Sequence, residues 1–495
     1  MASKKLYRFL RRSECFFRRW WRASRLCFCL LLMTLAPTFA QDDTEQQAQE
    51  PIAERAILIE NVNIFDGKKD AIKANHHVLV INQQIKKISD KSINYQGQLI
   101  RINGKGYTLM PGLIESHGHL AIVDNLSNLK HHFDWVEIGV RQAAMAKSWL
   151  LDGFTTVRDV GGPTMGLKRS IDAGVVPGPR IYPSGAIISQ TSGHGDIRER
   201  TDRHPYLESE SDEHMQRLGY YYIADGVPQV LAATRNNLRN GATQIKIMAG
   251  GGNGSEFDPI DSLQFRPQEM KAIVDAAKDW DTYVAAHVFY PKQINRFIDA
   301  GGMSLEHAPA INEATMKKVV NKGVFIAMQM NGLSKELRDS PFNPPYAKAG
   351  IIEIQKDSKD FIKLVKQYKP KMVFATDALG DVETQTKQRR FELYERARIF
   401  GNFETLKSAT SVAGELMLLT NRRNPYKLGK LGVIEQGAYA DLLLVAGNPL
   451  ADISLLGANK QWIDAESPQP IDTIKVIIKD GRIIKNILRY EDENN

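Results

Sequence analysis

Apolar and polar positions follow two kinds of pattern along the chain. Near both ends, short runs alternate apolar and polar side chains and are separated by turn signals such as Asp66-Gly67, which is typical of β-strands joined by tight turns. This pattern fills residues 56–110 and returns in residues 426–490. Because the two β-rich flanks enclose one central region, they predict a single small β-sandwich domain formed by both ends of the chain.

The central region, residues 111–425, alternates strand-like apolar runs with stretches of helical spacing. The strand candidates are residues 154–160, 179–188, 243–250, 282–288, 303–307, 324–329 and 371–378. The helix candidates are residues 134–153, 267–280, 291–301, 312–323 and 403–419. Strand–helix alternation over ~300 residues predicts a parallel sheet, and this length suits an α/β fold of the (β/α)8 TIM-barrel type.

Two longer insertions interrupt this alternation, at residues 189–226 and 331–357. Both follow strand candidates, and the loops that follow the strands of a TIM barrel lie on its active-site face. We therefore expect both insertions to lie over the active site.

The formal net charge of +8 comes from the amino-terminal segment. Residues 1–40 hold nine Lys or Arg residues and one Glu, so the rest of the 495-residue chain is neutral overall. With 43% hydrophobic and 25% charged residues, the composition is that of a folded globular protein, and its length suits a large domain plus a smaller one. A nucleic-acid-binding surface needs clustered positive charge and is therefore not predicted.

Residues 1–40 have the pattern of an export signal. A long basic stretch precedes the apolar run LCFCLLLMTLAP, and small residues before Gln41 indicate cleavage near Ala40. The run is shorter than the ~20 apolar residues of a typical transmembrane helix, although an uncleaved membrane anchor stays open. We predict a periplasmic or secreted protein without stable membrane insertion after signal removal, with residues 41–55 as a flexible tether.

All three cysteines, Cys15, Cys27 and Cys29, lie in the amino-terminal segment. The mature chain would then have no disulfide bond, no thiolate nucleophile and no zinc–thiolate site. A metal bound to the mature chain must therefore be held by nitrogen and oxygen atoms.

Ionisable side chains recur where strand candidates end. Inward-facing positions alternate along a barrel strand, and catalytic groups lie at its carboxyl end. This rule brings together six residues, which are His117, His119, Lys246, His287, His307 and Asp377. Taken alone, each has a structural explanation, such as a hydrogen-bonded histidine, a lysine whose charge reaches solvent, or an aspartate that caps a helix. The ordered set across five strand ends favours a shared metal site.

Two of these positions need a local explanation. Gly118, between the two histidines of GLIESHGHL, is expected to let the backbone turn sharply so that both imidazoles reach one rim. At Lys246, a buried ammonium next to metal ions would be repelled, and burial itself disfavours the charge. A neutral amine can instead react with carbon dioxide to give an anionic carbamate, whose two oxygens can bridge two metals.

The motifs MPGLIESHGHL, IKIMAGGG, AAHV, LEHAP and FATDA, in this order, resemble the amidohydrolase superfamily. TTVRDVGG, SGHGD and IKIMAGGG further resemble its imidazolonepropionase-like branch, which contains prolidases, Xaa-Arg dipeptidases and ochratoxin-hydrolysing amidases. The resemblance extends over residues 56–486. Two departures are the Ala-Pro of LEHAP, where many relatives have Gly, and the glycine-rich stretch AGGGNGSEFDP, which is expected to reshape the loop after Lys246.

The resemblance implies a binuclear metal centre. It assigns His117, His119 and Asp377 to one ion and His287 and His307 to the other, with carbamylated Lys246 bridging the two. Zinc is the usual ion in the family, and imidazole and carboxylate ligands suit it. The implied reaction is hydrolysis of an amide by a metal-activated hydroxide, with Asp377 as general acid and base.

Three residues are assigned to the substrate. His194, in the first insertion, is expected to hydrogen-bond a substrate carbonyl or carboxylate, with a loop-structuring role as the alternative. Arg198 and Tyr222 are expected to contact a substrate carboxylate, because the guanidinium fork matches that group. Asp159 is expected to orient a metal-binding histidine.

The function that the sequence predicts is a binuclear metal-dependent hydrolase acting on dipeptides or N-acyl amino acids. One alternative is a cyclic-amide hydrolase of the imidazolonepropionase type, although an export signal argues against a cytosolic role in histidine degradation. Another is an inactive barrel that serves as a scaffold, although all six ligands are present. The sequence leaves open the preferred side chains, the metal and whether the chain forms a homo-oligomer.

Overall fold

The computed structural model of the protein describes residues 55–207, 214–340 and 345–488. The predicted export signal, its three cysteines and all of the predicted tether except Arg55 lie outside this part of the chain. None of the helices in the described residues combines the length and the apolar composition that a membrane span requires.

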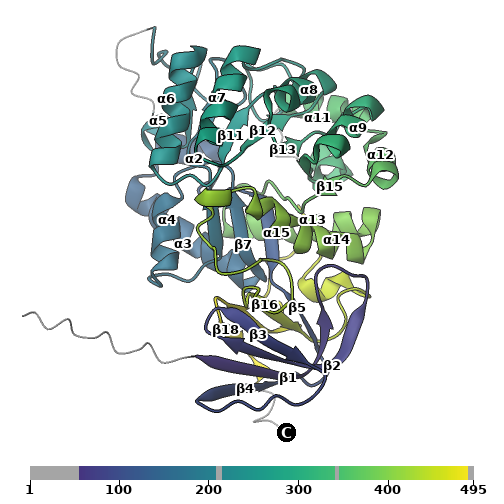
Figure 1. The fold of residues 1–495 in the computed structure, drawn as a ribbon. Helices are drawn as coiled ribbons and strands as arrows, with labels where there is room; N and C mark the ends of the chain where they lie inside the picture. Colours follow the sequence, from purple (N-terminus) through teal and green to yellow (C-terminus); the bar gives the residue numbers. More distant parts are fainter. Residues whose placement is uncertain (1–54, 208–213, 341–344, 489–495) are drawn as a thin grey trace, which may run out of the picture. The chain divides into compact units, whose positions relative to one another are not determined.

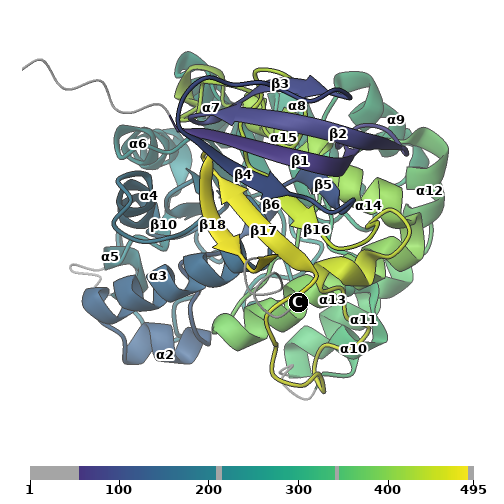
Figure 2. The same cartoon turned by 90° about the horizontal axis from the view of Figure 1, so that it is seen from below.

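Both ends of the chain contribute strands to one mixed eight-stranded sheet (Figures 1 and 2). Its strands are β1 (Ala56–Phe65), β2 (Ile72–Ile81), β3 (Gln84–Ser89), β4 (Leu99–Asn103), β5 (Thr108–Pro111), β16 (Leu442–Val445), β17 (Ile474–Lys479) and β18 (Arg482–Asn486). The order is β18-β17-β16-β5-β1-β2-β3, and β4 pairs with β1. The two β-rich flanks are joined by the antiparallel pair of β5 and β16. The two facing layers of a sandwich stay a prediction.

Alternate side chains of this sheet enter two different cores. Leu442 and Leu444 of β16 pack in one apolar cluster with other strands of the mixed sheet. Leu443, between them, packs in a second cluster with Trp149 and Phe154 of the strand–helix region. Because successive side chains of a strand point to opposite faces, β16 has no polar face and is a continuous apolar run.

The central region contains two parallel sheets. The three-stranded sheet has the order β6 (Leu113–Gly118), β7 (Phe154–Asp159), β8 (Arg180–Pro183). The seven-stranded sheet has the order β10 (Tyr221–Ile223), β9 (Ile187–Ser189), β11 (Ile245–Met248), β12 (Val284–Val288), β13 (Ser304–His307), β14 (Phe325–Ala327), β15 (Lys371–Met372). Each of the seven predicted runs contains strand residues, but the run 179–188 is divided between β8 and β9, which lie in different sheets, and the run 371–378 is a regular strand only at its start.

Backbone hydrogen bonds connect the two parallel sheets at two places. The amide of Ser116 on β6 donates to the carbonyl of Phe374, which follows β15, at 3.0 Å. The amide of Thr243, just before β11, donates to the carbonyl of Pro183 on β8 at 2.8 Å. The described strands therefore form two linked sheets, and a single closed eight-stranded barrel stays a prediction.

Helices follow most of these strands, and α6 to α9 lie at the end of Figure 1 opposite the mixed sheet. The α-helices are α2 (Leu126–His131), α3 (Trp135–Leu151), α4 (Met165–Asp172), α5 (His214–Arg217), α6 (Gly226–Arg239), α7 (Pro267–Asp279), α8 (Pro291–Ala300), α9 (Glu313–Lys322), α10 (Lys335–Arg338), α11 (Pro345–Asp357), α12 (Phe361–Tyr368), α13 (Val382–Phe400), α14 (Asn402–Ser408) and α15 (Ser411–Leu418). Short 3-10 helices are η1 (Asn331–Leu333), η2 (Asn421–Arg423) and η3 (Ile453–Leu456).

Four of the predicted helices are confirmed, and the fifth is divided. The predicted helix over residues 403–419 is two helices, α14 and α15, which are separated at Thr410. Thr410 has φ −132° and ψ −96°, outside the helical region. The carbonyl of Ala409 accepts a hydrogen bond from the amide of Ile114 on β6 at 2.7 Å. The carbonyl of Ala409 thus bonds to a strand instead of to an amide of a continuing helix.

Helix α13 was not predicted, because its buried side is polar. Its buried residues include Gln385, Arg389, Glu392 and Arg396, so the 3.6-residue apolar period that identifies an amphipathic helix is absent. Asp381 caps its amino terminus by accepting from the amide of Thr384 at 2.8 Å. The helix begins at Val382, five residues after the predicted ligand Asp377, and therefore lies next to the predicted site.

Candidate active site

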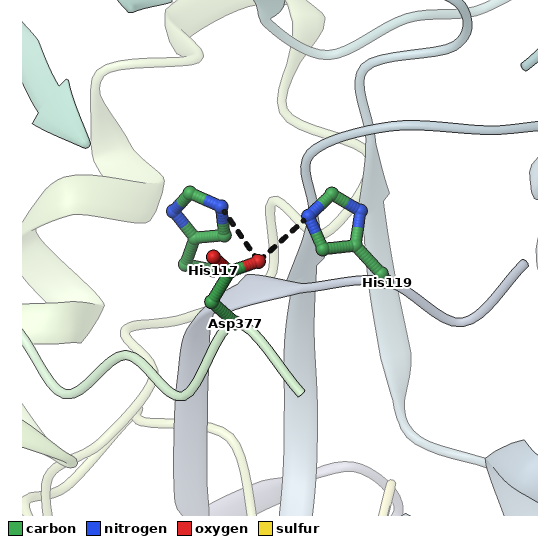
Figure 3. Close-up of side chains that lie close together, drawn as sticks. All are labelled: His117, His119 and Asp377. Carbon is green, nitrogen blue, oxygen red and sulfur yellow. Dashed lines mark ion pairs between the residues drawn. The ribbon is translucent and has the colours of Figure 1, made fainter. Parts of the chain in front are cut away.

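Three of the predicted ligands converge at the ends of two strands (Figure 3). His117 lies in β6, His119 directly follows β6, and Asp377 lies beyond β15. The Nε2 atoms of His117 and His119 are 3.5 and 3.2 Å from Oδ1 of Asp377. One ligand atom from each of the three residues lies within 4.8 Å of the others, so the group could hold one metal ion.

The backbone reaches this arrangement in two ways that the sequence did not indicate. Gly118 does not make the predicted sharp turn, because it lies in β6 and needs no positive φ. A Cβ atom there would lie 2.8 Å from Val157 on β7, so close packing of two strands is what requires glycine. Asp377 and His307 instead adopt positive φ of 51° and 74°, a conformation that costs energy for these residues and that clusters at functional sites.

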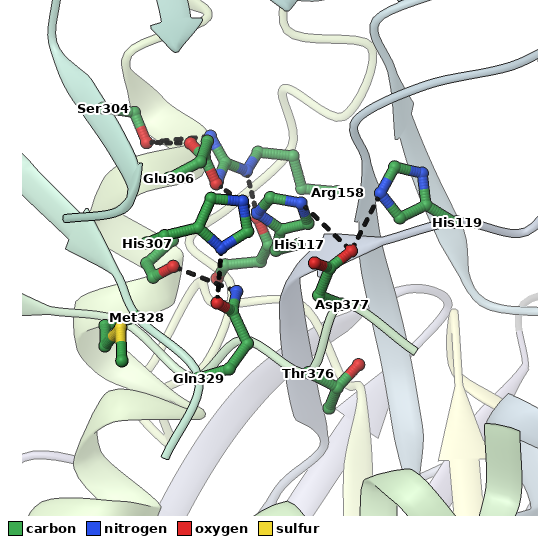
Figure 4. Close-up of polar contacts among 12 residues, drawn as sticks. His117, His119, Arg158, Ser304, Glu306, His307, Met328, Gln329, Thr376 and Asp377 are labelled. Atoms are coloured by element: carbon green, nitrogen blue, oxygen red, sulfur yellow. Dashed lines mark hydrogen bonds and ion pairs between the residues drawn. The ribbon is translucent and has the colours of Figure 1, made fainter. Parts of the chain in front are cut away.

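A buried carboxylate and a buried guanidinium orient His117 (Figure 4). Nδ1 of His117 donates to Oε2 of Glu306 at 2.6 Å. Glu306 also accepts two hydrogen bonds, at 2.8 and 2.9 Å, from Nη2 of Arg158. Both charged side chains are fully buried. Sequence reasoning missed this pair, although a charged residue inside an apolar strand is a usable signal, since a buried charge must be paired.

Charge and burial set the protonation states of this group. Burial, with the nearby ammonium of Lys246, lowers the pKa of His117 to about 3. Burial alone would raise the pKa of Glu306, but the Arg158 guanidinium and His117 hold it well below its usual range. Burial would also raise the pKa of Asp377, but the imidazoles, His117 first, hold it well below. At neutral pH the site therefore contains ionised carboxylates and a neutral imidazole.

These states fit a metal ion between His117 and Asp377. Since Nδ1 of His117 donates to Glu306, its Nε2 carries a lone pair and faces the negatively charged Oδ1 of Asp377. Two electron-rich atoms that face each other at 3.5 Å repel, and a divalent cation between them would remove that repulsion. The nitrogen and oxygen donors are also those that zinc accepts.

The other two predicted histidines lie beside this cluster. The ring centroids of His287 and His307 are 4.5 Å apart, and those of His117 and His307 are 5.0 Å apart. Nδ1 of His307 is 2.7 Å from Oε1 of Gln329, and Nε2 of His287 is 3.2 Å from the carbonyl of Gly251. Burial lowers the pKa of His307 to about 4 and that of His287 well below its usual value, so both rings are neutral and able to bind a cation.

Lys246 lies in β11 and is 1% exposed. Burial lowers its pKa to about 8, while Glu306 and Asp377 act in the opposite direction. Its charge interacts electrostatically with His117, His287 and His307, so the structure brings the lysine into the same group as the predicted ligands. Among the His, Cys, Asp and Glu side chains of the described residues, one group of three, His117, His119 and Asp377, has donor atoms within 4.8 Å of one another.

The predicted substrate residues lie in different surroundings. The ring of His194 stacks on that of His287, with centroids 4.1 Å apart and planes at 25°. Arg198 forms a two-point ion pair with Asp196 at 2.7 Å, which already occupies the guanidinium fork. The hydroxyl of Tyr222 accepts from Nδ2 of Asn236 on α6 at 2.8 Å. The structure thus brings His194 to the histidines, whereas Arg198 contacts Asp196 and Tyr222 contacts Asn236.

Within the described residues, Asp159 interacts with His119 through its charge but makes no hydrogen bond to an imidazole. Its Oδ2 accepts from the backbone amide of Leu120 at 2.8 Å, and its Oδ1 accepts from the hydroxyl of Thr164 at 3.1 Å. Nδ1 of His119 is buried and has no hydrogen-bond partner among the residues that the structure describes. Asp159 therefore holds the chain that follows His119, through backbone contacts that residue spacing does not reveal.

The amidohydrolase family model matches residues 108–484. The ochratoxinase of Aspergillus niger is 35% identical over 254 residues, which are 46% of this chain and 51% of that protein. The chain thus aligns with about half the length of this curated relative.

Solved structures are similar over more of the chain. A prolidase complexed with N-methylphosphonate-L-proline has 31% identity and a TM-score of 0.76, covering 87% of this chain and 100% of the other. A Xaa-Pro dipeptidase with bound methionine in its active site has 25% identity and a TM-score of 0.71, with the same coverage. These neighbours imply an α/β fold of the TIM-barrel type for the central region. The chain therefore belongs to the amidohydrolase family, in its prolidase- and ochratoxinase-like branch.

Proposed function

We propose that the protein is a metal-dependent hydrolase that cleaves the amide bond of dipeptides or N-acyl amino acids. The observation that carries this proposal is the group of His117, His119 and Asp377, whose donor atoms lie within 4.8 Å of one another. The prolidase and dipeptidase neighbours support an amide substrate with a free carboxylate, because their names describe enzymes of that kind. The pattern of residues 1–40 supports a periplasmic or secreted location.

Two divalent cations, most simply zinc, complete the proposed site. His117, His119 and Asp377 would hold one, His287 and His307 the other, and a carbamate on Lys246 would lie between them. Cations held there would supply Lewis acidity, which lowers the pKa of water and polarises a carbonyl group. The pKa of Lys246, which burial lowers to about 8, supports formation of the carbamate, because only the neutral amine reacts with carbon dioxide.

The side chains of the site would transfer protons, orient a metal ligand and contact the substrate. Asp377 is ionised and its side chain keeps 33% exposure, so its carboxylate can take a proton from the attacking water and return it to the leaving nitrogen. Glu306 and Arg158 keep His117 in one tautomer, with Nε2 turned toward Asp377. His194, stacked on His287, would contact the carbonyl or carboxylate of the substrate.

A hydrolysis screen tests this function. The zinc-loaded protein is incubated with a panel of L-Xaa-L-Xaa dipeptides and N-acyl amino acids, and release of the amine is measured. We expect hydrolysis of some members and its loss in Asp377→Asn, while the exposed Asp261→Asn control keeps full activity. The proposal fails if the wild type binds zinc but cleaves no member of the panel, or if Asp377→Asn remains as active as the wild type.

A further inference from the structure

The segment that follows β11 contains a buried carboxylate with an unusual set of partners. The side chain of Asp258 has 0% exposure, and its Oδ2 lies 3.0 Å from Nδ1 of His194. The same oxygen accepts from the backbone amide of Gly252 at 2.9 Å, and Oδ1 accepts from the hydroxyl of Ser255. A carboxylate is only an acceptor, so the imidazole nitrogen that faces it must carry a proton.

A second side chain fixes the backbone of the same histidine. Oε1 of Gln264 accepts from the amide of His194 at 2.9 Å, and its Nε2 lies 3.4 Å from Oδ2 of Asp258. Both the ring and the main chain of His194 are therefore held by residues of the segment after β11. This contact joins the first insertion to the strand end that carries Lys246.

Glycine at position 252 leaves room for the ring. A Cβ atom on Gly252 would lie 2.2 Å from Cε1 of His194, a distance that real atoms do not adopt. The same atom on Gly254, two residues later, would meet the ring at 3.6 Å, which is ordinary contact. Neither glycine has a positive φ, so alanine fits the backbone at both positions and the two differ only in this contact.

Nε2 of His194 is the ring nitrogen that is available to contact a substrate. Nδ1 is occupied by Asp258 and Ser255, whereas Nε2 makes no hydrogen bond within the described part of the chain. The side chain is 15% exposed and its ring covers His287, one of the proposed ligands. A carboxylate that takes the Nδ1 proton determines both the tautomer and the direction of Nε2.

We propose that Asp258 is a positioning residue that fixes the tautomer and orientation of His194, and that Gly252 provides the space this orientation needs. The proposal rests on the proposed function for its effect on turnover, since His194 is assigned there to the substrate. It adds to that function a carboxylate and a glycine outside the ligand set, both on one segment after β11.

The first measurement needs no substrate. In protein with isotopically labelled histidine, the Nδ1 proton of His194 gives a low-field NMR signal, which is assigned by its loss in His194→Gln. We expect this signal to disappear in Asp258→Asn and to shift in Gly252→Ala. It should be unchanged in the two matched controls, Asp261→Asn and Gly254→Ala. Persistence of the wild-type signal in both Asp258→Asn and Gly252→Ala would overturn the proposal.

The second measurement separates positioning from general stability. With a substrate from the hydrolysis screen, Asp258→Asn and Gly252→Ala should each lower kcat/KM by about tenfold or more. Because Asp258 acts through His194, the double variant Asp258→Asn with His194→Ala should be no worse than His194→Ala alone. A further loss in the double variant would refute action through His194. If no substrate is found at all, the proposed function fails, while the NMR measurement still decides the positioning role.

Discussion

At the scale of single residues, the site depends on charged side chains buried inside strands. Arg158 and Glu306 are both 0% exposed, and Lys246 is 1% exposed. Transferring an isolated charge from water to a protein interior costs several kcal/mol, so each of these groups needs a partner. Arg158 has four partners, because besides Glu306 it donates to the carbonyl of Ser116, to the hydroxyl of Ser304 at 3.0 Å and to the hydroxyl of Tyr283 at 3.4 Å. These partners offset the cost of burying the Arg158–Glu306 pair, and the pair orients His117, a proposed metal ligand.

We predict that Glu306→Gln weakens zinc binding by about 10- to 100-fold, the usual effect of losing a partner of a metal-binding histidine. The amide cannot accept as strongly from Nδ1 of His117 and leaves Arg158 without a negative charge. Competition with a coloured chelator measures the affinity. Glu404→Gln, at an exposed position, is the matched control. Unchanged affinity in Glu306→Gln would show that this carboxylate does not orient His117.

The pKa of Lys246 leads to a pH dependence of carbamate formation. The pKa is lowered from its usual value to about 8, so the neutral amine is scarce below that pH and predominant above it. At a fixed concentration of dissolved carbon dioxide, carbamate should therefore increase as the pH rises. After treatment with a chelator, the carbamate carbon signal in 13C NMR should grow at least about tenfold between about pH 6.5 and about pH 8.5. The signal should be missing in Lys246→Met and should level off above about pH 8.5. With an unshifted pKa the signal would keep rising about tenfold per pH unit there, and such a rise would contradict the shift.

At the scale of elements, α13 connects the site to the rest of the fold through polar contacts. Nε2 of Gln385 donates to the carbonyl of Ile122 at 2.9 Å, in the chain that follows His119. Oε2 of Glu392 accepts from the amide of Asn331 at 2.7 Å, at the start of the second insertion. The helix thus binds the segments after β6 and β14 through hydrogen bonds from polar side chains to their backbones. Apolar side chains could not make these bonds.

Helix α13 is joined to α3 by a buried ion pair that we expect to contribute strongly to stability. Oδ2 of Asp152 accepts from Nη2 of Arg389 at 2.9 Å, and Arg389 is fully buried against Trp149. Asp152→Asn leaves this guanidinium without a counter-charge and should lower the free energy of unfolding by about 3–5 kcal/mol. Urea unfolding measures the change. Asp275→Asn breaks an exposed pair with Lys271 and should have little effect. Equal effects in the two variants would contradict the role of burial.

Elements with a regular apolar period could be predicted from the sequence, whereas those with polar interiors could not. Strand β12 and helix α8 could be recognised from the sequence because β12 is a short apolar run and the apolar positions of α8 repeat with the helical period. Helix α13 was not, since Arg389 and Glu392 occupy its buried positions. Thr410 divides α14 from α15 because a neighbouring strand bonds to Ala409, a tertiary contact that no local pattern contains.

The same limit applies to the site. Strand-end position was enough to select His117, His119 and Asp377, because the side-chain period of a strand is two. The residues that orient the side chains of the site could not be selected in this way, because their contacts depend on how distant parts of the chain face each other. Glu306, 189 positions from His117, and Asp258, 64 positions from His194, are examples. The ion pair of Arg198 is another example, since its partner Asp196 lies two residues away but faces it only in the folded loop, and the substrate contact of Arg198 stays a prediction.

At the scale of the whole molecule, the proposed ligands come from strands spread over residues 117–377. They are contributed by β6, β11, β12, β13 and the chain after β15. A cation bound to several of them stabilises the folded state relative to the unfolded chain, in which these donors are far apart. The metal would therefore act on the stability of the central region as well as on the reaction.

We predict that zinc raises the melting temperature of the metal-free protein. At about 100 times the dissociation constant, binding to the folded state adds about 2.7 kcal/mol to the free energy of unfolding. Thermal unfolding with and without zinc measures the shift, which should be strongly reduced in Asp377→Asn. His76→Ala, in the mixed sheet, should keep the full shift. A wild-type protein whose melting temperature does not respond to zinc would exclude a metal site of this kind.

The mixed sheet determines when this chain can finish folding. Strand β5 lies between β1 and β16, and β16 is separated from it by more than three hundred residues. During synthesis, the edge of β5 has no partner until the ribosome has released the last strands. A nascent chain that stops before residue 442 carries an open, apolar edge able to pair with other chains. Carboxy-terminal truncations should therefore give insoluble protein, even where every proposed ligand is retained.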